Sequence, residues 1–142
     1  MVDIIDAAGY FVYLSYGKRN HSLTPLKLQK LLYLSQGWSY VWDDKPAFAE
    51  DFEAWKYGPV NEEVYIKFKK YGRNEIDETE SIPELSDKDV EETLDAVWCE
   101  YGGKSAYELV DLTHNQRPWK DAYKVGTKIT KHSIEQYFQS TY

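Results

Sequence analysis

The chain has 142 residues, a formal net charge of −7 and a single cysteine. This length allows a core without metal or disulfide staples, and a hydrophobic content of 42% argues against disorder. One cysteine excludes an intrachain disulfide and a cysteine-based zinc site. The N-terminus lacks a signal-peptide pattern, and no stretch is apolar for long enough to cross a membrane. We therefore expect one soluble, cytoplasmic domain over residues 1–142 that has no membrane partner.

Two helices are predicted in the first third of the chain. Residues 3–16 place apolar side chains at helical spacing, with Asp3 as a candidate N-cap. The next helix starts in TPLKLQKLLYLSQGWSYVW, where Thr24 can act as N-cap and Pro25 occupies a position that needs no N–H donor. Because apolar residues from Leu28 to Trp42 cover much of its girth, this helix is predicted to lie at the centre of the core.

The middle of the chain predicts a turn-rich segment, a helix and a loop. Short pieces around Phe48 and over residues 52–55 alternate as strands do, which predicts a small two-stranded hairpin before the break at Gly58 and Pro59. Residues 61–70 are amphipathic and predict a helix. The stretch over about 72–85 is polar and acidic and contains Pro83, so a mobile acidic loop is predicted there.

The second half of the chain predicts further helices. Ser86 is the expected N-cap of a helix that ends before Gly102. Ser105 and Glu108 have the spacing of a capping box, and Thr130 can cap a last short helix. The predicted fold class is therefore mainly α, a compact single-domain helical bundle with a small two-stranded β-hairpin.

The sequence offers little for catalysis. It contains none of the common nucleophile, metal or phosphate-binding motifs, so we assign no catalytic, cofactor-binding or metal-binding residue. Cys99, next to Trp98, is interpreted as a buried, inert thiol. His114 ends a predicted helix, and a hydrogen-bonded structural role is favoured over a catalytic one. A hydrolase or nuclease using His114 is the least favoured alternative, and the scattered basic residues disfavour nucleic-acid binding.

Aromatic residues are the more informative feature. Five Trp and 13 Tyr exceed what one small core needs, and both types are enriched at protein interfaces. Three of these aromatic residues lie at predicted turns near prolines, in AWKYGPV and NQRPW: Trp55, Tyr57 and Trp119. Strand alternation places Trp55 and Tyr57 on one face. That face is an interface if it points outward and core if it points inward, and the sequence leaves both open.

Three segments, LTPLKLQKLLYLSQGW, EAWKYGPVNEEVY and DLTHNQRPWKDA, resemble those of the Panacea domain, also called the SocA-like or phage-associated GepA family. They follow the family's order and span roughly residues 4–125. The resemblance implies a non-enzymatic antitoxin that binds and neutralises a protein toxin encoded by a neighbouring gene. It also admits a proteolytic adaptor, because one member delivers its toxin to ClpXP, or a general protein-interaction module.

The resemblance and the aromatic pattern together indicate candidate partner-binding residues. The set combines the hairpin turn with the late segment that contains Trp119, and consists of Trp55, Tyr57, Gly58, Pro59, Val60, His114 and Trp119. His114 and Trp119 are expected to lie close together, with Trp119 near the LQKLLY helix. The negative net charge would complement a basic toxin.

Overall fold

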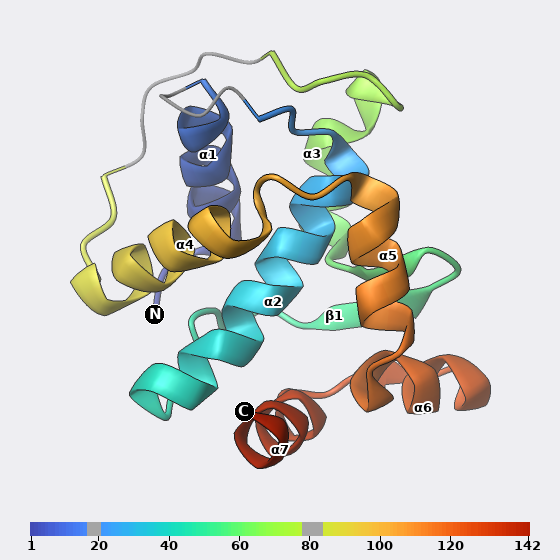
Figure 1. The fold of residues 1–142 in the computed structure, drawn as a ribbon. Helices are drawn as coiled ribbons and strands as arrows, with labels where there is room; N and C mark the ends of the chain where they lie inside the picture. Colours follow the sequence, from blue (N-terminus) through green and yellow to red (C-terminus); the bar gives the residue numbers. More distant parts are fainter. Residues whose placement is uncertain (17–20, 78–83) are drawn as a thin grey trace.

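A central helix organises the fold. The computed structural model describes residues 1–16, 21–77 and 84–142. Helix α2 (Pro25–Asp43) runs through the middle of the molecule and packs against α1, α3, α4, α5, α7 and strand β2 (Figure 1). The surrounding helices are α1 (Ile4–Ser15), α3 (Glu62–Phe68), α4 (Lys88–Tyr101), α5 (Ala106–His114), α6 (Arg117–Val125) and α7 (Lys131–Thr141). A 3-10 turn, η1 (Lys69–Tyr71), extends α3. The predicted mainly α fold is confirmed.

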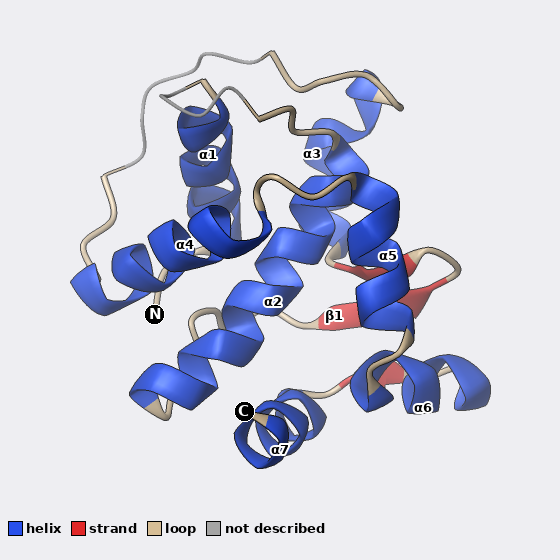
Figure 2. Ribbon diagram, in the orientation of Figure 1, coloured by secondary structure: helices blue, strands red, loops and turns tan. Residues whose placement is uncertain are grey.

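A small antiparallel sheet lies beside α5 and α6 (Figure 2). Strands β1 (Phe52–Trp55) and β2 (Gly58–Val60) form the predicted hairpin, in which Trp55 pairs with Gly58. Strand β3 (Lys128–Ile129) joins the other edge of β1 and makes the order β2-β1-β3. This third strand was not predicted, because two residues are too short to show an alternating pattern.

Helix α2 is buried around its whole circumference over residues 27–37. Helix α7 crosses it closely, since a Cβ at Gly37 would collide with the ring of Phe138. The polar Gln36 is also buried, and its Oε1 accepts hydrogen bonds from the backbone N–H groups of Ala47 and Phe48. The predicted central position of this helix is confirmed. The buried polar side chains of α2 bind backbone groups of neighbouring segments, because buried polar groups require hydrogen-bond partners.

Most predicted helix starts are confirmed. The side chains of Asp3, Thr24 and Thr130 cap α1, α2 and α7, and the predicted capping box opens α5. The start of α4 differs by one residue from the prediction. Its N-cap is Asp87, whose Oδ1 accepts from the Val90 N–H (3.3 Å), because a cap side chain must reach the N–H three residues on.

The interpretation of Cys99 as buried is wrong, because its side chain is exposed. The neighbouring Trp98 is buried on the core face of α4. One residue further along a helix rotates the side chain by about 100° and turns it away from that face.

The described ends of the predicted acidic loop pack onto the core. Ile76 and Leu85 are buried, and the Ile76 N–H donates to the Leu23 carbonyl oxygen (2.9 Å). The central part of the predicted mobile loop, residues 78–83, lies outside the described residues. Across the parts of the chain that the structure describes, no helix is both long and apolar enough to cross a membrane.

Candidate protein-interaction site

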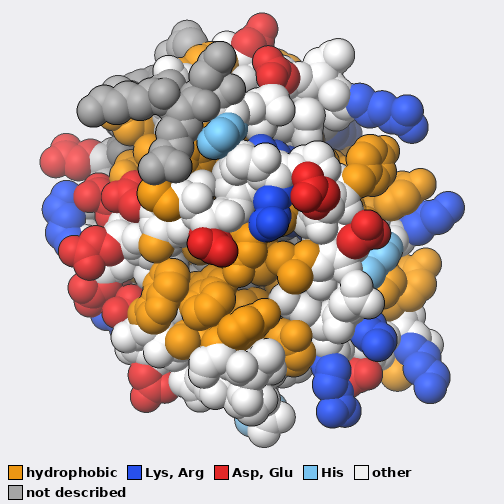
Figure 3. All heavy atoms as spheres, in the orientation of Figure 1, with side chains coloured by type: hydrophobic (Ala, Val, Ile, Leu, Met, Phe, Trp, Pro, Cys, Tyr) orange, Lys and Arg blue, Asp and Glu red, His pale blue; other side chains and the backbone are white. Residues whose placement is uncertain are grey.

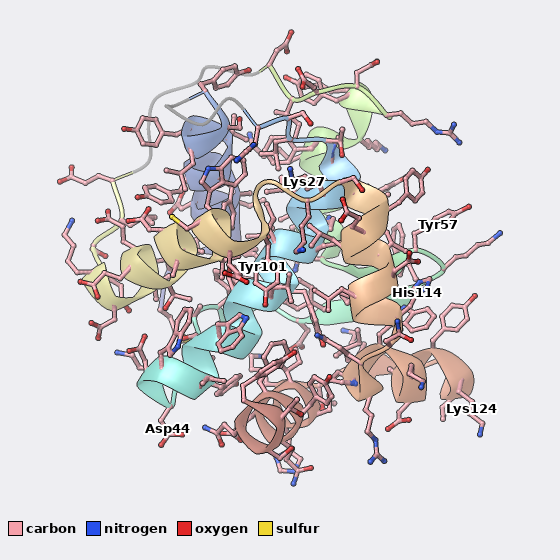
Figure 4. The ribbon with its side chains drawn as sticks, in the orientation of Figure 1. Lys27, Asp44, Tyr57, Tyr101, His114 and Lys124 are labelled. Carbon is pink, nitrogen blue, oxygen red and sulfur yellow. The ribbon has the colours of Figure 1, made fainter. Side chains whose placement is uncertain are left out.

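Residues 54–60, hereafter the hairpin turn, lie where the three sequence segments meet. Helix α2 contains the first segment, β1 and β2 the second, and the junction between α5 and α6 the third. Figure 4 shows Tyr57 on the outer side of the turn and His114 at the end of α5, next to α6. Segments far apart in the chain therefore build one local structure.

Side chains of α2 hold strand β2. The Oε1 of Gln29 accepts from the Asn61 N–H (2.8 Å), and its Nε2 donates to the Asn61 carbonyl oxygen (3.0 Å). The Nζ of Lys30 donates to the Pro59 carbonyl oxygen (3.0 Å). Strand β2 is at the edge of the sheet, so these side chains satisfy backbone groups that lack a strand partner.

Lys30 and Gly58 fit each other closely. Lys30 is fully buried, and burial lowers the pKa of its ammonium group to about 7. Gly58 has a φ of 110°, and a Cβ there would lie 2.5 Å from Lys30 Cε and 3.0 Å from Thr113 Oγ1. Glycine is required here both by the backbone conformation and by the close approach.

The α5–α6 junction holds the other side of the hairpin turn. His114 Nε2 donates to the Lys56 carbonyl oxygen (2.9 Å), and Trp119 Nε1 donates to the Trp55 carbonyl oxygen (2.7 Å). The His114 and Trp119 rings stack with centroids 4.0 Å apart, and Tyr123 stacks on Trp119 at 4.6 Å. The expected proximity of His114 and Trp119 is confirmed.

This junction is tied to α2 through a buried pair. Tyr33 OH, on α2, donates to Gln116 Oε1 (2.8 Å). Gln116 lies between His114 and Trp119 in the chain, in the NQRPW sequence. The backbone of the hairpin turn is therefore held both from α2 and from the α5–α6 junction, and the Tyr33–Gln116 hydrogen bond joins α2 to that junction.

The outer face of the hairpin turn opens onto a groove of about 290 Å³, the turn–α3 groove. Trp55, Tyr57 and Tyr65 line it together with the apolar residues Leu26, Val60, Val64 and Phe68. The Trp55 ring meets Tyr65 edge-on at 4.8 Å, while Tyr57 is 50% exposed. Trp55 and Tyr57 thus line one groove, and this groove faces solvent. Strand alternation does not account for this placement, because β1 ends at Trp55 and the intervening Lys56 lines the same groove.

The seven candidate residues occupy three different environments. Tyr57 is exposed, and Trp55, His114 and Trp119 are half-buried. The remaining three are buried within the turn: Gly58, Pro59 and Val60. Contact of any of these residues with a partner stays a prediction.

Sequence reasoning missed Gln29 and Lys30. Their signal was available in KLQKLLY, where polar residues recur on a helix that was itself predicted to be central. A buried lysine is uncommon and is retained where it has a specific hydrogen-bond partner. Among the described residues, no group of three or more His, Cys, Asp and Glu side chains could hold a metal ion.

Comparison with known proteins assigns the chain to a family. The sequence model of the antitoxin SocA-like proteins, the Panacea domain, matches residues 28–120. The chain belongs to this family. The match includes α2 from Leu28, the hairpin turn and the α5–α6 junction, so the hydrogen-bond network around the turn lies within the Panacea domain.

One curated relative is Antitoxin SocA of Caulobacter vibrioides (strain NA1000 / CB15N), which is 34% identical over 109 residues. The aligned region covers 68% of this chain and 58% of that protein, so the match spans less than two thirds of the relative's length. No solved structure matches the chain significantly.

Trp119→Ala is expected to destabilise this Panacea domain by about 2–4 kcal/mol, since it removes a half-buried, twice-stacked ring and leaves the Trp55 carbonyl without its donor. Trp119→Phe keeps much of the stacking and should cost about 1 kcal/mol for the lost hydrogen bond. Urea denaturation measures both. Equal stability of wild type and Trp119→Ala would show that the ring does not support the turn.

Proposed function

We propose that this protein is a cytoplasmic, non-enzymatic antitoxin that binds and neutralises a cognate protein toxin encoded by a neighbouring gene. Membership of the SocA-like family supports an antitoxin role. The observation that favours neutralisation by direct binding is the exposed aromatic surface at the hairpin turn, carried on a backbone fixed by Lys30, His114 and Trp119.

A fixed aromatic turn suits protein binding. Tyr57 exposes half of its surface although the three residues that follow it, Gly58 to Val60, are buried. Ordering a flexible segment on binding costs free energy, and a turn already held by several hydrogen bonds avoids most of that cost. Tyrosine and tryptophan also contribute strongly to binding at interfaces.

The position of His114 supports a non-enzymatic role. Its Nε2 proton is donated to the Lys56 carbonyl oxygen, and one face of its ring is covered by Trp119. A general base needs a nitrogen within reach of a substrate or nucleophile proton. The contacts of His114 instead support a structural role in holding the turn.

The function is tested by expressing the neighbouring gene alone and together with this protein. Toxicity of the neighbour alone, relieved by co-expression and accompanied by a stable complex in pull-down, is the expected result. A neighbour that is harmless, or harmful equally with and without this protein, would contradict the proposal.

Tyr57→Ala is expected to abolish rescue while leaving the unfolding free energy within about 0.5 kcal/mol of wild type, because exposed side chains contribute little to stability. Tyr13→Ala, a tyrosine of 44% exposure on α1, is the matched control and should rescue fully. Trp42→Ala probes a second aromatic surface, where Trp42 stacks on Trp38 at 4.9 Å. Full rescue by Tyr57→Ala together with loss in Trp42→Ala would move the binding site to that surface.

Delivery to a ClpXP-type protease is a separate proposal for the fate of the bound toxin. If the antitoxin acts by delivery, the toxin's half-life shortens on co-expression, and rescue disappears in cells without the protease. If it acts by occlusion, rescue persists in those cells.

A further inference from the structure

We propose that the turn–α3 groove binds an acidic, amphipathic segment of the partner protein, whose apolar side chains enter the groove while its carboxylates meet Lys56 and Lys69. This inference rests on the proposed function and specifies the chemistry of the toxin surface at the hairpin turn. It differs from the expectation drawn from net charge, which favours a basic toxin.

The shape of the groove fits one or two large apolar side chains. Its volume is about 290 Å³, and Val60, Val64 and Phe68 line it as buried residues. The partly exposed rings of Trp55, Tyr57 and Tyr65 line it as well. Aromatic and aliphatic side chains are typical anchors in such sites, because they displace water from the apolar surface.

The charges that line the groove have one sign. Lys56 and Lys69 contribute to its lining, and none of its lining residues is acidic. Lys56 Nζ lies 5.6 Å from the centroid of the Tyr57 ring, so this positive charge accompanies the exposed aromatic side chain. An occupant that carries Asp or Glu beside its apolar anchors would complement both features.

Many acidic residues lie away from the groove, although Glu53 Oε1 accepts a hydrogen bond from Nε1 of the groove residue Trp55 (2.8 Å). Figure 3 shows Asp and Glu side chains gathered at the left, over α4, while Lys and Arg side chains are more frequent at the right-hand edge, where the hairpin turn and α6 lie. A chain with a net charge of −7 thus presents local positive charge at this groove. Local potential, more than net charge, selects the partner surface that docks at a given site.

The test is selection from a displayed library of random peptides of about 16 residues against the full chain. Peptides whose binding is lost in Tyr65→Ala are assigned to the groove, because this ring lines it. We expect these peptides to be enriched in Asp and Glu together with Leu, Phe and Trp. The double variant Lys56→Glu/Lys69→Glu should lower the affinity for these peptides about tenfold. The control Lys104→Glu/Lys124→Glu changes the net charge by the same amount outside the groove lining, and it should change the affinity less than about twofold.

Several results would overturn the inference: recovery of no groove-dependent peptide, enrichment of Lys and Arg among those peptides, or equal weakening by the two double variants. These results are independent of the rescue assay. If the wild type fails to rescue, the antitoxin proposal fails, yet peptide selection still reports on the groove. If the wild type rescues and the folded Lys56→Glu/Lys69→Glu variant rescues equally well, the antitoxin proposal stands and the groove assignment falls.

Discussion

Lys30→Met should remove a rise in folding stability of about 2 kcal/mol that the wild-type protein shows between about pH 7 and about pH 9. Lys30 is fully buried, and its pKa in the folded state is lowered to about 7 by burial. In the unfolded chain the same ammonium titrates near its ordinary value of 10.5. Between these two values the unfolded chain binds more protons than the folded one, so stability increases as the pH rises.

The measurement is urea denaturation of both proteins at several pH values in this window. Lys104→Met, which removes an exposed lysine, is the matched control and should keep the wild-type profile. The window ends below about pH 10, because burial raises the pKa of the Tyr33 phenol and ionisation of tyrosines in the unfolded chain then lowers stability. Parallel profiles for wild type and Lys30→Met would show that Lys30 titrates as an exposed lysine does.

At about pH 7 the same substitution also affects the hairpin turn. Methionine fills much of the space of the lysine stem but cannot donate to the Pro59 carbonyl oxygen. The unpaired carbonyl costs about 1–3 kcal/mol, while the cost of burying an ammonium group disappears. The two effects oppose each other, so the pH profile is the more informative readout of the state of Lys30.

Gly58→Ala should destabilise the protein by about 2–5 kcal/mol. A left-handed backbone costs an alanine about 1–2 kcal/mol, and forcing a methyl group into close contact adds about 1–3 kcal/mol. Both apply at Gly58, where φ is 110° and the new Cβ would lie 2.5 Å from Lys30 Cε. Thermal and urea denaturation measure the loss.

Gly126→Ala is the matched control. Gly126 also has a positive φ, 81°, but no neighbouring atom lies within 4 Å of its Cβ position. Its substitution should show the backbone cost alone. The cost of Gly58→Ala should also be smaller in a Lys30→Ala background, since the truncated side chain no longer meets the new methyl group. Equal losses at Gly58 and Gly126 would contradict the close packing of Lys30 beneath the turn.

Local patterns in the sequence were sufficient for most of the secondary structure. The caps at Asp3, Thr24 and Thr130 and the box that opens α5 each depend on residues within four positions of one another. The hairpin follows from a short alternating run that ends at Gly58 and Pro59. Family membership could also be predicted from the sequence, because each of the three segments is an uninterrupted stretch and they follow the family's order.

The candidate site could be predicted only in part. Proximity of His114 and Trp119 follows from a short turn in the chain. Strand alternation could not place Tyr57, because β1 ends at Trp55 and Lys56 and Tyr57 belong to the turn. The exposure of Cys99 and the pairing of β3 with β1 could not be read from those patterns. The first depends on which face of α4 is covered, and the second on a contact between residues more than 70 positions apart.

The helices, the hairpin and the family could thus be predicted from the amino-acid order alone, because each depends on short-range spacing or on short motifs. The role of the polar residues of α2 and the position of the exposed aromatic surface depend on contacts between distant segments, which are visible only in the folded protein. Gln29 and Lys30 are buried because their partners, Asn61 and Pro59, are brought to them by the fold. The local positive charge of the groove likewise depends on the fold placing Lys56 and Lys69 in the lining of one groove, which neither composition nor net charge can show.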